Sequence, residues 1–175
     1  MNPGPRILLF TGDGKGKTTA ALGMAARAAG HGMAALVLEF IKARRDTGEI
    51  AAFGRLPEIT VRQVGLGFVP PPSSPAFADH RQAAARGLEE ATAALASGRY
   101  AMVILDEICT AVAKNLVAEE AVVAAVRGAA PGAVVVLTGR GATPGLIALA
   151  DTVPEMRSVK HGYEAGWKAQ KGVEF

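Results

Sequence analysis

A glycine-rich stretch, TGDGKGKTT at residues 11–19, lies between a short apolar run and a segment of helix-forming residues. The apolar run ILLF (residues 7–10) is typical of a buried β-strand. The residues from Lys17 to Ala29 predict a helix, which Gly30 ends. A strand that passes through a glycine loop straight into a helix restricts the chain to folds in which strands and helices alternate.

The remainder of the chain continues this alternation. Further strands are expected at residues 34–40, 59–64, 101–107 and 133–139, and further helices at 76–96, 119–127 and from Pro144 onward. The proline-rich segment 65–75 predicts a surface loop, because prolines lack a backbone donor and restrict their neighbours. The pattern predicts an α/β fold with a mostly parallel sheet, helices on both faces, and a single domain over residues 1–175.

Composition excludes several classes of protein. The formal net charge is +3 and the basic residues are scattered, so no nucleic-acid partner is expected. No apolar run reaches the roughly 20 residues that span a bilayer, and the first residues lack the apolar core of a signal peptide. The single cysteine, Cys109, cannot form an internal disulfide and is expected to fill apolar space. We therefore expect a cytoplasmic protein without membrane contact.

The glycine loop nearly matches the phosphate-binding pattern G-x-x-x-x-G-K-[ST]. Gly16, Lys17 and Thr18 supply its last three positions, while Thr11 stands where the pattern begins with glycine. In this pattern backbone N–H groups and the lysine bind phosphate oxygens, and the hydroxyl binds magnesium. The start of the following helix also directs its positive end at the anion. The loop therefore predicts a nucleotide phosphate site.

A pair of carboxylates ends the apolar strand VILDE. Asp106 and Glu107 come at the carboxyl end of this strand, where ligands bind in parallel sheets. Either carboxylate can bind magnesium directly or through water, and the residues alone leave the choice open. In a hydrolase or kinase the other carboxylate would orient the acceptor, and Arg140 in LTGRG would balance phosphoryl charge. The motifs alone indicate magnesium-dependent nucleotide chemistry.

Segments spread over nearly the whole chain form a more specific combination. They are FTGDGKGKTTAALGMAARAAGHG (10–32), EFIK (39–42), VILDE (103–107), LTGRGA (137–142), LADTVPEMRSVKH (149–161) and AGWKAQKGVEF (165–175). In this order they resemble the P-loop type of ATP:corrinoid adenosyltransferase. The resemblance implies a P-loop NTPase (RecA-like) architecture.

The resemblance also implies a reaction. A corrinoid reduced to cobalt(I) attacks the C5′ carbon of ATP, takes the 5′-deoxyadenosyl group and releases inorganic triphosphate, which completes the coenzyme form of vitamin B12. The implied co-substrate is ATP with Mg²⁺, and the implied assembly is a homodimer supplied with electrons by an external reductase. Two alternatives remain from the residues alone: a P-loop ATPase or small-molecule kinase, and a nucleotide-gated module that passes on the finished cofactor.

Site residues follow from the same resemblance. It assigns ATP binding to the loop residues Gly12, Asp13, Gly14, Lys15, Gly16, Lys17, Thr18 and Thr19, and to Arg27 near the phosphates. Lys17, Thr18 and Glu107 are the expected catalytic residues, with Thr18, Glu107 and Asp106 as the expected magnesium site. Phe68 is expected to press on the corrin ring, although the tryptophan that follows it in the family is absent here. Trp167 is expected to pack inward on a short amphipathic helix.

Overall fold

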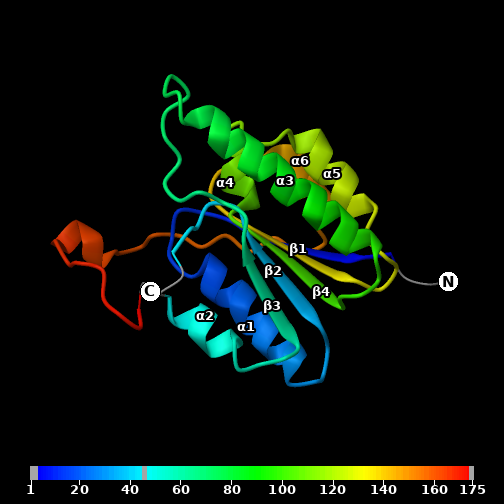
Figure 1. Ribbon diagram of the computed structural model, residues 1–175. Helices are drawn as coiled ribbons and strands as arrows, with labels where there is room; N and C mark the ends of the chain where they lie inside the picture. The colour runs from blue at the N-terminus through cyan, green and yellow to red at the C-terminus, as the bar shows by residue number, and fades with distance from the viewer. Residues whose placement is uncertain (1–3, 45–46, 174–175) are drawn as a thin grey trace.

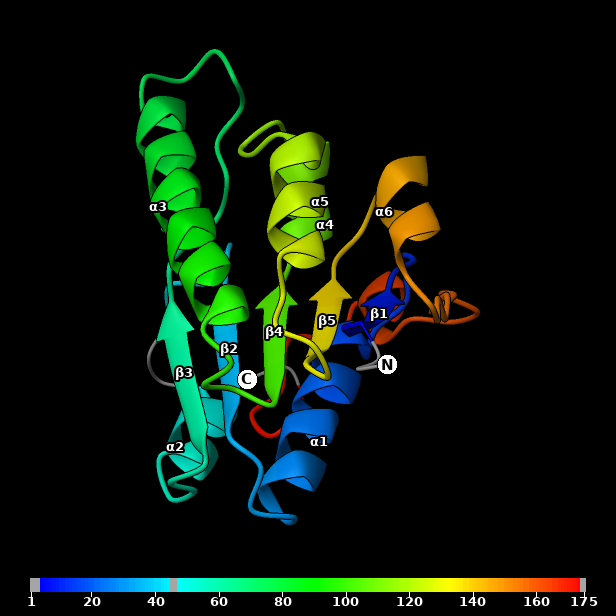
Figure 2. The ribbon, with the colours of Figure 1, turned by 90° about the vertical axis from the view of Figure 1, so that its right-hand side faces the viewer.

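A single sheet of parallel strands forms the centre of the computed structural model, which describes residues 4–44 and 47–173. The strands are β1 (Arg6–Phe10), β2 (Ala35–Glu39), β3 (Ile59–Gln63), β4 (Met102–Asp106) and β5 (Val134–Thr138). Their order across the sheet is β1-β5-β4-β2-β3, and every pairing is parallel (Figure 2). The predicted strands and their parallel arrangement are confirmed.

Helices cover both faces of the sheet, as expected. One face carries α1 (Lys17–Ala29) and α2 (Gly48–Phe53), and the other carries α3 (Phe77–Ala96), α4 (Ile108–Ala113), α5 (Glu119–Arg127) and α6 (Pro144–Leu149) (Figure 1). Thr143 caps α6 through its side chain, and Pro144 stands in the first turn, where its missing N–H costs nothing. No helix in the described part of the chain is long and apolar enough to cross a membrane.

Alternation along the strands divides the core into two layers. In β4, for example, Val103 and Leu105 belong to the cluster under α3, α4, α5 and α6, whereas Met102 and Ile104 belong to the cluster under α1. The central strands β2 and β4 are buried along their whole length because helices lie on both sides of them. Both apolar layers hold the strand ends rigidly, and the polar residues that follow the strands meet at one edge of the sheet.

A C-terminal segment, residues 151–156, runs beside β1 and protects the edge of the sheet. The N–H of Leu9 donates to the carbonyl of Thr152 at 2.9 Å, and parallel bridges join Leu8 to Thr152 and Thr11 to Glu155. Asp151 adds a side-chain bond, since its Oδ2 accepts from the N–H of Ile7 at 2.8 Å. An exposed strand edge is a template for aggregation, so this pairing both covers β1 and fixes the chain that follows.

Two helices and one side chain differ from the prediction. The polar connection after β2 contains α2, and α4 follows directly after Glu107, where no helix was predicted. Both are short, which gives too few residues for a helical period to show. The predicted inward packing of Trp167 is wrong: the segment forms a short 3-10 helix, η1 (Gly162–Ala165), followed by irregular chain, and Trp167 is 73% exposed.

Gly87 lies where α3 packs closely against the end of β3. A Cβ atom added at Gly87 would lie 2.6 Å from Cγ2 and 3.0 Å from Cβ of Val64. We expect Gly87→Ala to lower the free energy of unfolding by about 1–3 kcal/mol, because overpacking outweighs the better helix propensity of alanine. Gly23→Ala in α1 is the matched control, since its Cβ meets no atom within 4 Å. Urea unfolding that showed both variants stabilised would contradict this packing.

Candidate active site

The glycine loop folds around the ammonium group of Lys17. Gly16 adopts a left-handed conformation (φ 117°) immediately before α1 begins. Lys17 Nζ donates to the carbonyl oxygens of Gly12 and Gly14, each at 2.7 Å, and the residue is only 7% exposed. Burial lowers the pKa of Lys17, although the charge of Glu107 opposes this change. An anion bound beside the ammonium would raise that pKa again, so anion binding favours the charged lysine.

The structure explains why this loop begins with threonine. Thr11 extends β1 by one bridge: its N–H donates to the carbonyl of Pro154 at 3.2 Å, and its carbonyl accepts from the N–H of Met156 at 2.8 Å. A threonine suits this extended, paired position better than a glycine does. The chain turns one residue later, at Gly12, whose φ is 97°. The conformational role of the usual first glycine has moved to the next residue.

The C-terminal segment continues past Thr11 and packs against the turn of the loop. The N–H of Gly14 donates to the carbonyl of Met156 at 2.6 Å. A Cβ atom at Gly14 would lie 2.7 Å from the carbonyl carbon and oxygen of Arg157 and from the carbonyl oxygen of Met156. Farther along, the carbonyl of Val173 accepts from Lys15 Nζ at 2.7 Å. Residues from both halves of the chain therefore form the phosphate loop and its support.

Asp106 organises the hydroxyl groups below the loop. Its Oδ1 accepts from Thr18 Oγ1 at 2.8 Å and from Thr138 Oγ1 at 2.7 Å, so it ties the start of α1 to the ends of β4 and β5. The residue is 1% exposed, and its Oδ2 has no hydrogen-bond partner in the described part of the protein. Because Thr18 donates its hydroxyl hydrogen bond to Asp106, the lone pairs of the Thr18 oxygen remain free to bind another ligand.

Glu107 lies beside Asp106 but points differently. Its backbone is left-handed (φ 61°), a conformation that a non-glycine residue adopts only where the surroundings hold it. Its N–H donates to Thr138 Oγ1 at 2.9 Å, and its Oε2 accepts from the hydroxyl of Thr110. This turn directs the Glu107 carboxylate into the cavity, whereas that of Asp106 stays buried beneath it.

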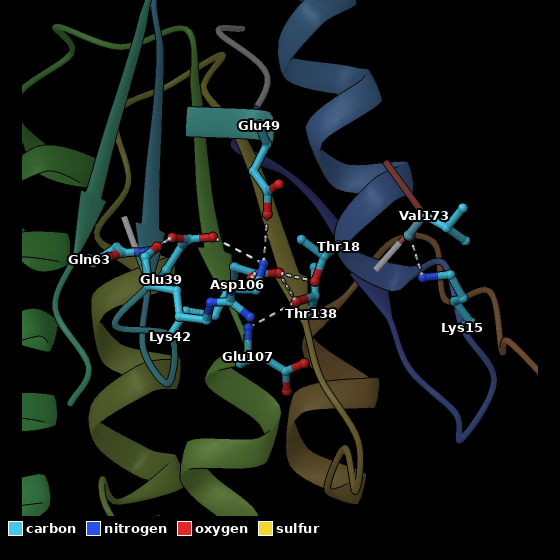
Figure 3. A network of polar contacts seen from close by, with 11 residues as sticks. Lys15, Thr18, Glu39, Lys42, Glu49, Gln63, Asp106, Glu107, Thr138 and Val173 are labelled. Carbon is cyan, nitrogen blue, oxygen red and sulfur yellow. Dashed lines mark hydrogen bonds and ion pairs between the residues drawn. The ribbon is translucent and has the colours of Figure 1, made fainter. Parts of the chain in front are cut away.

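A lysine from the EFIK segment closes the network at the ends of β2 and β4. Lys42 Nζ lies 3.0 Å from Glu39 Oε1, 3.4 Å from Asp106 Oδ2 and 3.5 Å from Glu49 Oε1, as Figure 3 shows. Gln63 at the end of β3 donates to the other oxygen of Glu39 at 2.9 Å. Glu39 is 1% exposed, so Lys42 supplies the charge that lets two buried carboxylates lie close together.

The loop and both carboxylate-bearing strand ends border one cavity of about 1020 Å³. Leu22 and Ala26 of α1 and Ala52 and Phe53 of α2 give it an apolar wall. The opposite side carries Glu107, Thr110, Lys114, Arg140 and His161. The volume is at the upper end of the range for drug-sized ligands, about 300–1,000 Å³, so the cavity has room beyond a single small metabolite.

Phe68 stands at the border of this cavity. It follows Gly67 (φ 94°) in the irregular segment after β3, and it is 91% exposed although it is aromatic. The predicted irregular loop is confirmed here, since no helix or strand occupies residues 65–75. An aromatic ring left in water at the edge of a cavity offers a flat apolar contact to a ligand.

The structure brings most of the predicted site residues together. Gly14, Lys15, Gly16, Lys17, Thr18, Thr19, Phe68 and Glu107 line the cavity. Gly12 shapes the loop, Asp13 is exposed beside it, and Asp106 lies below the floor. Arg27 is exposed in the last turn of α1 and is not among the residues that line this cavity.

Several residues of the site were not predicted. Lys42, Glu39, Glu49, Gln63 and Thr110 all belong to the network around the carboxylates. The available signal was position, because Glu39 and Gln63 end strands that run parallel to β4. Cys109 is fully buried, and burial raises the pKa of its thiol to about 12, so the predicted role as apolar filler is confirmed.

Fold and site together define an α/β protein with the P-loop architecture. The chain shares its fold with the flagellar accessory protein FlaH from Methanocaldococcus jannaschii, with a TM-score of 0.58 over 89% of this chain and 72% of that one. The sequence identity is 11%, so this likeness concerns the fold alone. In the observed sheet, β5 separates the strand of the phosphate loop from the strand of the carboxylates.

Sequence comparison gives the particular family. Residues 4–175 match the family described as ATP:corrinoid adenosyltransferase BtuR/CobO/CobP. A corrinoid adenosyltransferase from Pseudomonas aeruginosa is 42% identical, over 97% of this chain and 83% of that protein. One from Escherichia coli K12 is 38% identical over 97% of this chain and 85% of that protein. The chain belongs to the ATP:corrinoid adenosyltransferase family.

The contact between the C-terminal segment and the loop can be tested at Gly14. We expect Gly14→Ala to weaken ATP binding strongly, because its Cβ would collide with the backbone of Met156 and Arg157 and push the loop away from its support. Gly48→Ala is the matched control, since it borders the same cavity and its Cβ meets no atom within 4 Å. Calorimetric titration with ATP measures both. Equal affinity in the two variants would show that the loop does not need this close contact.

Lys42→Met tests the charge network. We expect a loss of roughly 3 kcal/mol in the free energy of unfolding, the low end for breaking a buried ion pair, because the Lys42 side chain is 30% exposed. Burial acts to lower the pKa of Lys42, but Asp106 and Glu39 raise it above the ordinary 10.5. The stabilisation is therefore fully present below about pH 10.5 and is lost as the pH rises through the folded-state pKa.

Urea unfolding of wild type and Lys42→Met at several pH values measures this contribution. The difference between them should stay constant from about pH 7 to about pH 9 and shrink in more alkaline solution. Lys114→Met serves as the control, because Lys114 is exposed and makes no ion pair with another described residue. A Lys42→Met protein as stable as wild type at neutral pH would contradict the assigned role.

Proposed function

We propose that this chain transfers the 5′-deoxyadenosyl group of ATP to the cobalt(I) of a corrinoid. The observation that carries the proposal is one cavity in which a phosphate loop, an apolar wall and an exposed aromatic side chain meet. The loop fits a triphosphate, and the remaining volume leaves space for a second, larger substrate to approach. Membership in the family supplies the reaction class.

The reaction is a displacement at carbon. The cobalt(I) electron pair attacks C5′ of ATP, the cobalt–carbon bond forms, and the bond from C5′ to the α-phosphate oxygen breaks with its electrons on the oxygen. Inorganic triphosphate leaves, and the cobalt is formally oxidised to cobalt(III). No proton leaves the nucleophile, so no protein base is required. What the protein must do is stabilise the negative charge that grows on the triphosphate.

Lys17 and the loop provide this stabilisation. The Lys17 ammonium already lies against the carbonyl oxygens of Gly12 and Gly14 in the loop, and burial strengthens its interaction with an incoming anion. The N-terminal end of α1, which begins at Lys17 and has no acidic residue in its first turn, adds its dipole. These groups are in place before the reaction, which lowers the reorganisation needed in the transition state.

The residues present fit a magnesium ion. Among the described residues no group of three or more His, Cys, Asp or Glu side chains could hold a metal by itself. Mg²⁺ needs no such group, since it usually keeps several waters and takes substrate phosphates with one or two protein ligands. Thr18 Oγ1 and the Glu107 carboxylate would hold the ion. Asp106 would orient Thr18 by accepting the hydrogen bond of its hydroxyl group. The ion would supply positive charge to the departing phosphates.

The other parts of the cavity suit the other parts of the substrates. The apolar wall of Leu22, Ala26, Ala52 and Phe53 offers a surface to the adenosine moiety. Phe68, exposed at the opening, is placed to contact the flat face of a corrin ring. The tryptophan that follows this phenylalanine in the family is replaced by the proline-rich segment, so Phe68 carries the aromatic contact on this loop alone.

Further features of the proposal come from the family and the composition. We infer a homodimer, an external reductase that supplies the electron for cobalt(I), and a cytoplasmic location with residues 1–175 working as one domain.

An anaerobic assay with ATP, magnesium and chemically reduced cobalt(I) corrinoid tests the function. The corrinoid spectrum should show formation of the alkylated product, and triphosphate should appear in equal amount. ADP and phosphate with an unchanged corrinoid would instead assign the chain to the P-loop ATPases or kinases. Binding of both substrates without either product would indicate a carrier module.

Lys17→Ala links this activity to the loop. We expect kcat to fall about 100- to 1,000-fold, the usual effect of removing a charge-stabilising group from a transition state. Lys15→Ala should have a milder effect, because Lys15 is exposed and its ammonium donates to the carbonyl of Val173. Circular dichroism controls for folding. Unchanged turnover by a folded Lys17→Ala protein would remove the loop from the mechanism.

A further inference from the structure

One positive charge that lines the cavity, that of Arg140, has no ion-pair partner among residues 4–44 and 47–173. Arg140 follows β5, the strand that lies between the strand of the loop and the strand of the carboxylates. It lines the same cavity as Lys17 and makes no ion pair with another described residue. Lys42, which also lines the cavity, is surrounded by three carboxylates. Arg140 is therefore free to bind an anionic ligand, whereas Lys42 is not.

The backbone holds Arg140 in a fixed relation to the carboxylate of the site. Its N–H donates to Thr110 Oγ1 at 3.0 Å, and the same hydroxyl donates to Glu107 Oε2. Gly139 (φ 137°) and Gly141 (φ 68°) on either side of it adopt conformations that a side chain disfavours. A Cβ atom at Gly139 would lie 2.7 Å from the backbone nitrogen of Thr110. The turn is thus tightly packed on α4 and presents a single arginine to the cavity.

The charges around Lys17 also indicate that Arg140 lies near the phosphate loop. Burial is the main cause that lowers the pKa of Lys17, and the positive charge of Arg140 contributes to it, so the two cations act on each other across the cavity. Glu107, Asp13 and Asp106 oppose this effect. Two like charges that converge on one space are stabilised by an anion placed between them. Arginine suits a phosphate better than lysine does, because its planar fork donates two parallel hydrogen bonds.

We propose that Arg140, at the end of β5 next to the strand of the phosphate loop, binds the triphosphate and stabilises it as the leaving group. This inference rests on the proposed function for its role in the reaction, but polyphosphate binding by Arg140 can be measured without the reaction. Arg140 is exposed, and its side chain makes no hydrogen bond or ion pair with another described residue, so its removal should leave the fold intact.

Calorimetric titration of the full chain with magnesium tripolyphosphate is the first test. We expect Arg140→Ala to weaken binding about 10- to 100-fold, the range of a hydrogen bond to a charged group. Arg140→Lys should lie between this variant and wild type, since it keeps the charge but loses the fork. Lys114→Ala is the control: it removes an equal charge from the same cavity wall and should change the affinity little.

The outcomes separate the inference from the proposed function. Wild-type affinity in Arg140→Ala, or an equal loss in Lys114→Ala, would overturn the assignment, the second because it would show only a general cationic field. In the anaerobic assay Arg140→Ala should lower kcat with the KM for corrinoid unchanged. A raised corrinoid KM with unchanged tripolyphosphate affinity would place Arg140 at the corrinoid and also overturn it. ADP production by wild type would reject the proposed function but leave the titration result standing.

Discussion

Backbone pairing between the C-terminal segment and the first strand is the interaction on which the site depends. Residues 151–156 run beside β1, continue along Thr11 and reach Gly14, so the same ladder of hydrogen bonds supports a structural strand and the phosphate loop. A loop of glycines has little rigidity of its own, because glycine loses more conformational freedom on folding than any other residue. Here residues 151–156 supply that rigidity, so the loop carbonyls of Gly12 and Gly14 that contact Lys17 are held in place.

A second set of contacts balances charge below the loop. One oxygen of Asp106 accepts hydrogen bonds from the hydroxyls of Thr18 and Thr138, and the other faces Lys42. Glu107, one residue later, is turned into the cavity by its left-handed backbone. Adjacent carboxylates thereby acquire different roles: one stays buried and orients a hydroxyl, and the other meets the ligand. Buried charge is tolerated because each carboxylate has a donor or a cation beside it.

Sequence patterns predicted the strands, the long helices and the meeting of polar strand ends, because these depend on local apolar period and on parallel topology. Asp106 and Glu107 were found in the same way, whereas Thr18 was found from the phosphate-binding pattern of the glycine loop. The helices α2 and α4 are too short to carry a period, and Lys42 gave no local signal because its partners come from three separate elements. The predicted packing of Trp167 failed because no helix forms there, and the residue lies in an irregular, exposed segment.

The position of β1 has a consequence for how the chain is made. β1 is synthesised well before its neighbours in the sheet, which are β5 (Val134–Thr138) and residues 151–156. Contacts between residues so far apart in sequence form slowly, since a long loop must close before they contribute. The first strand and the phosphate loop therefore wait, unpaired, until most of the polypeptide has been synthesised. The phosphate loop therefore gains its backbone support only after residues 151–156 have been synthesised.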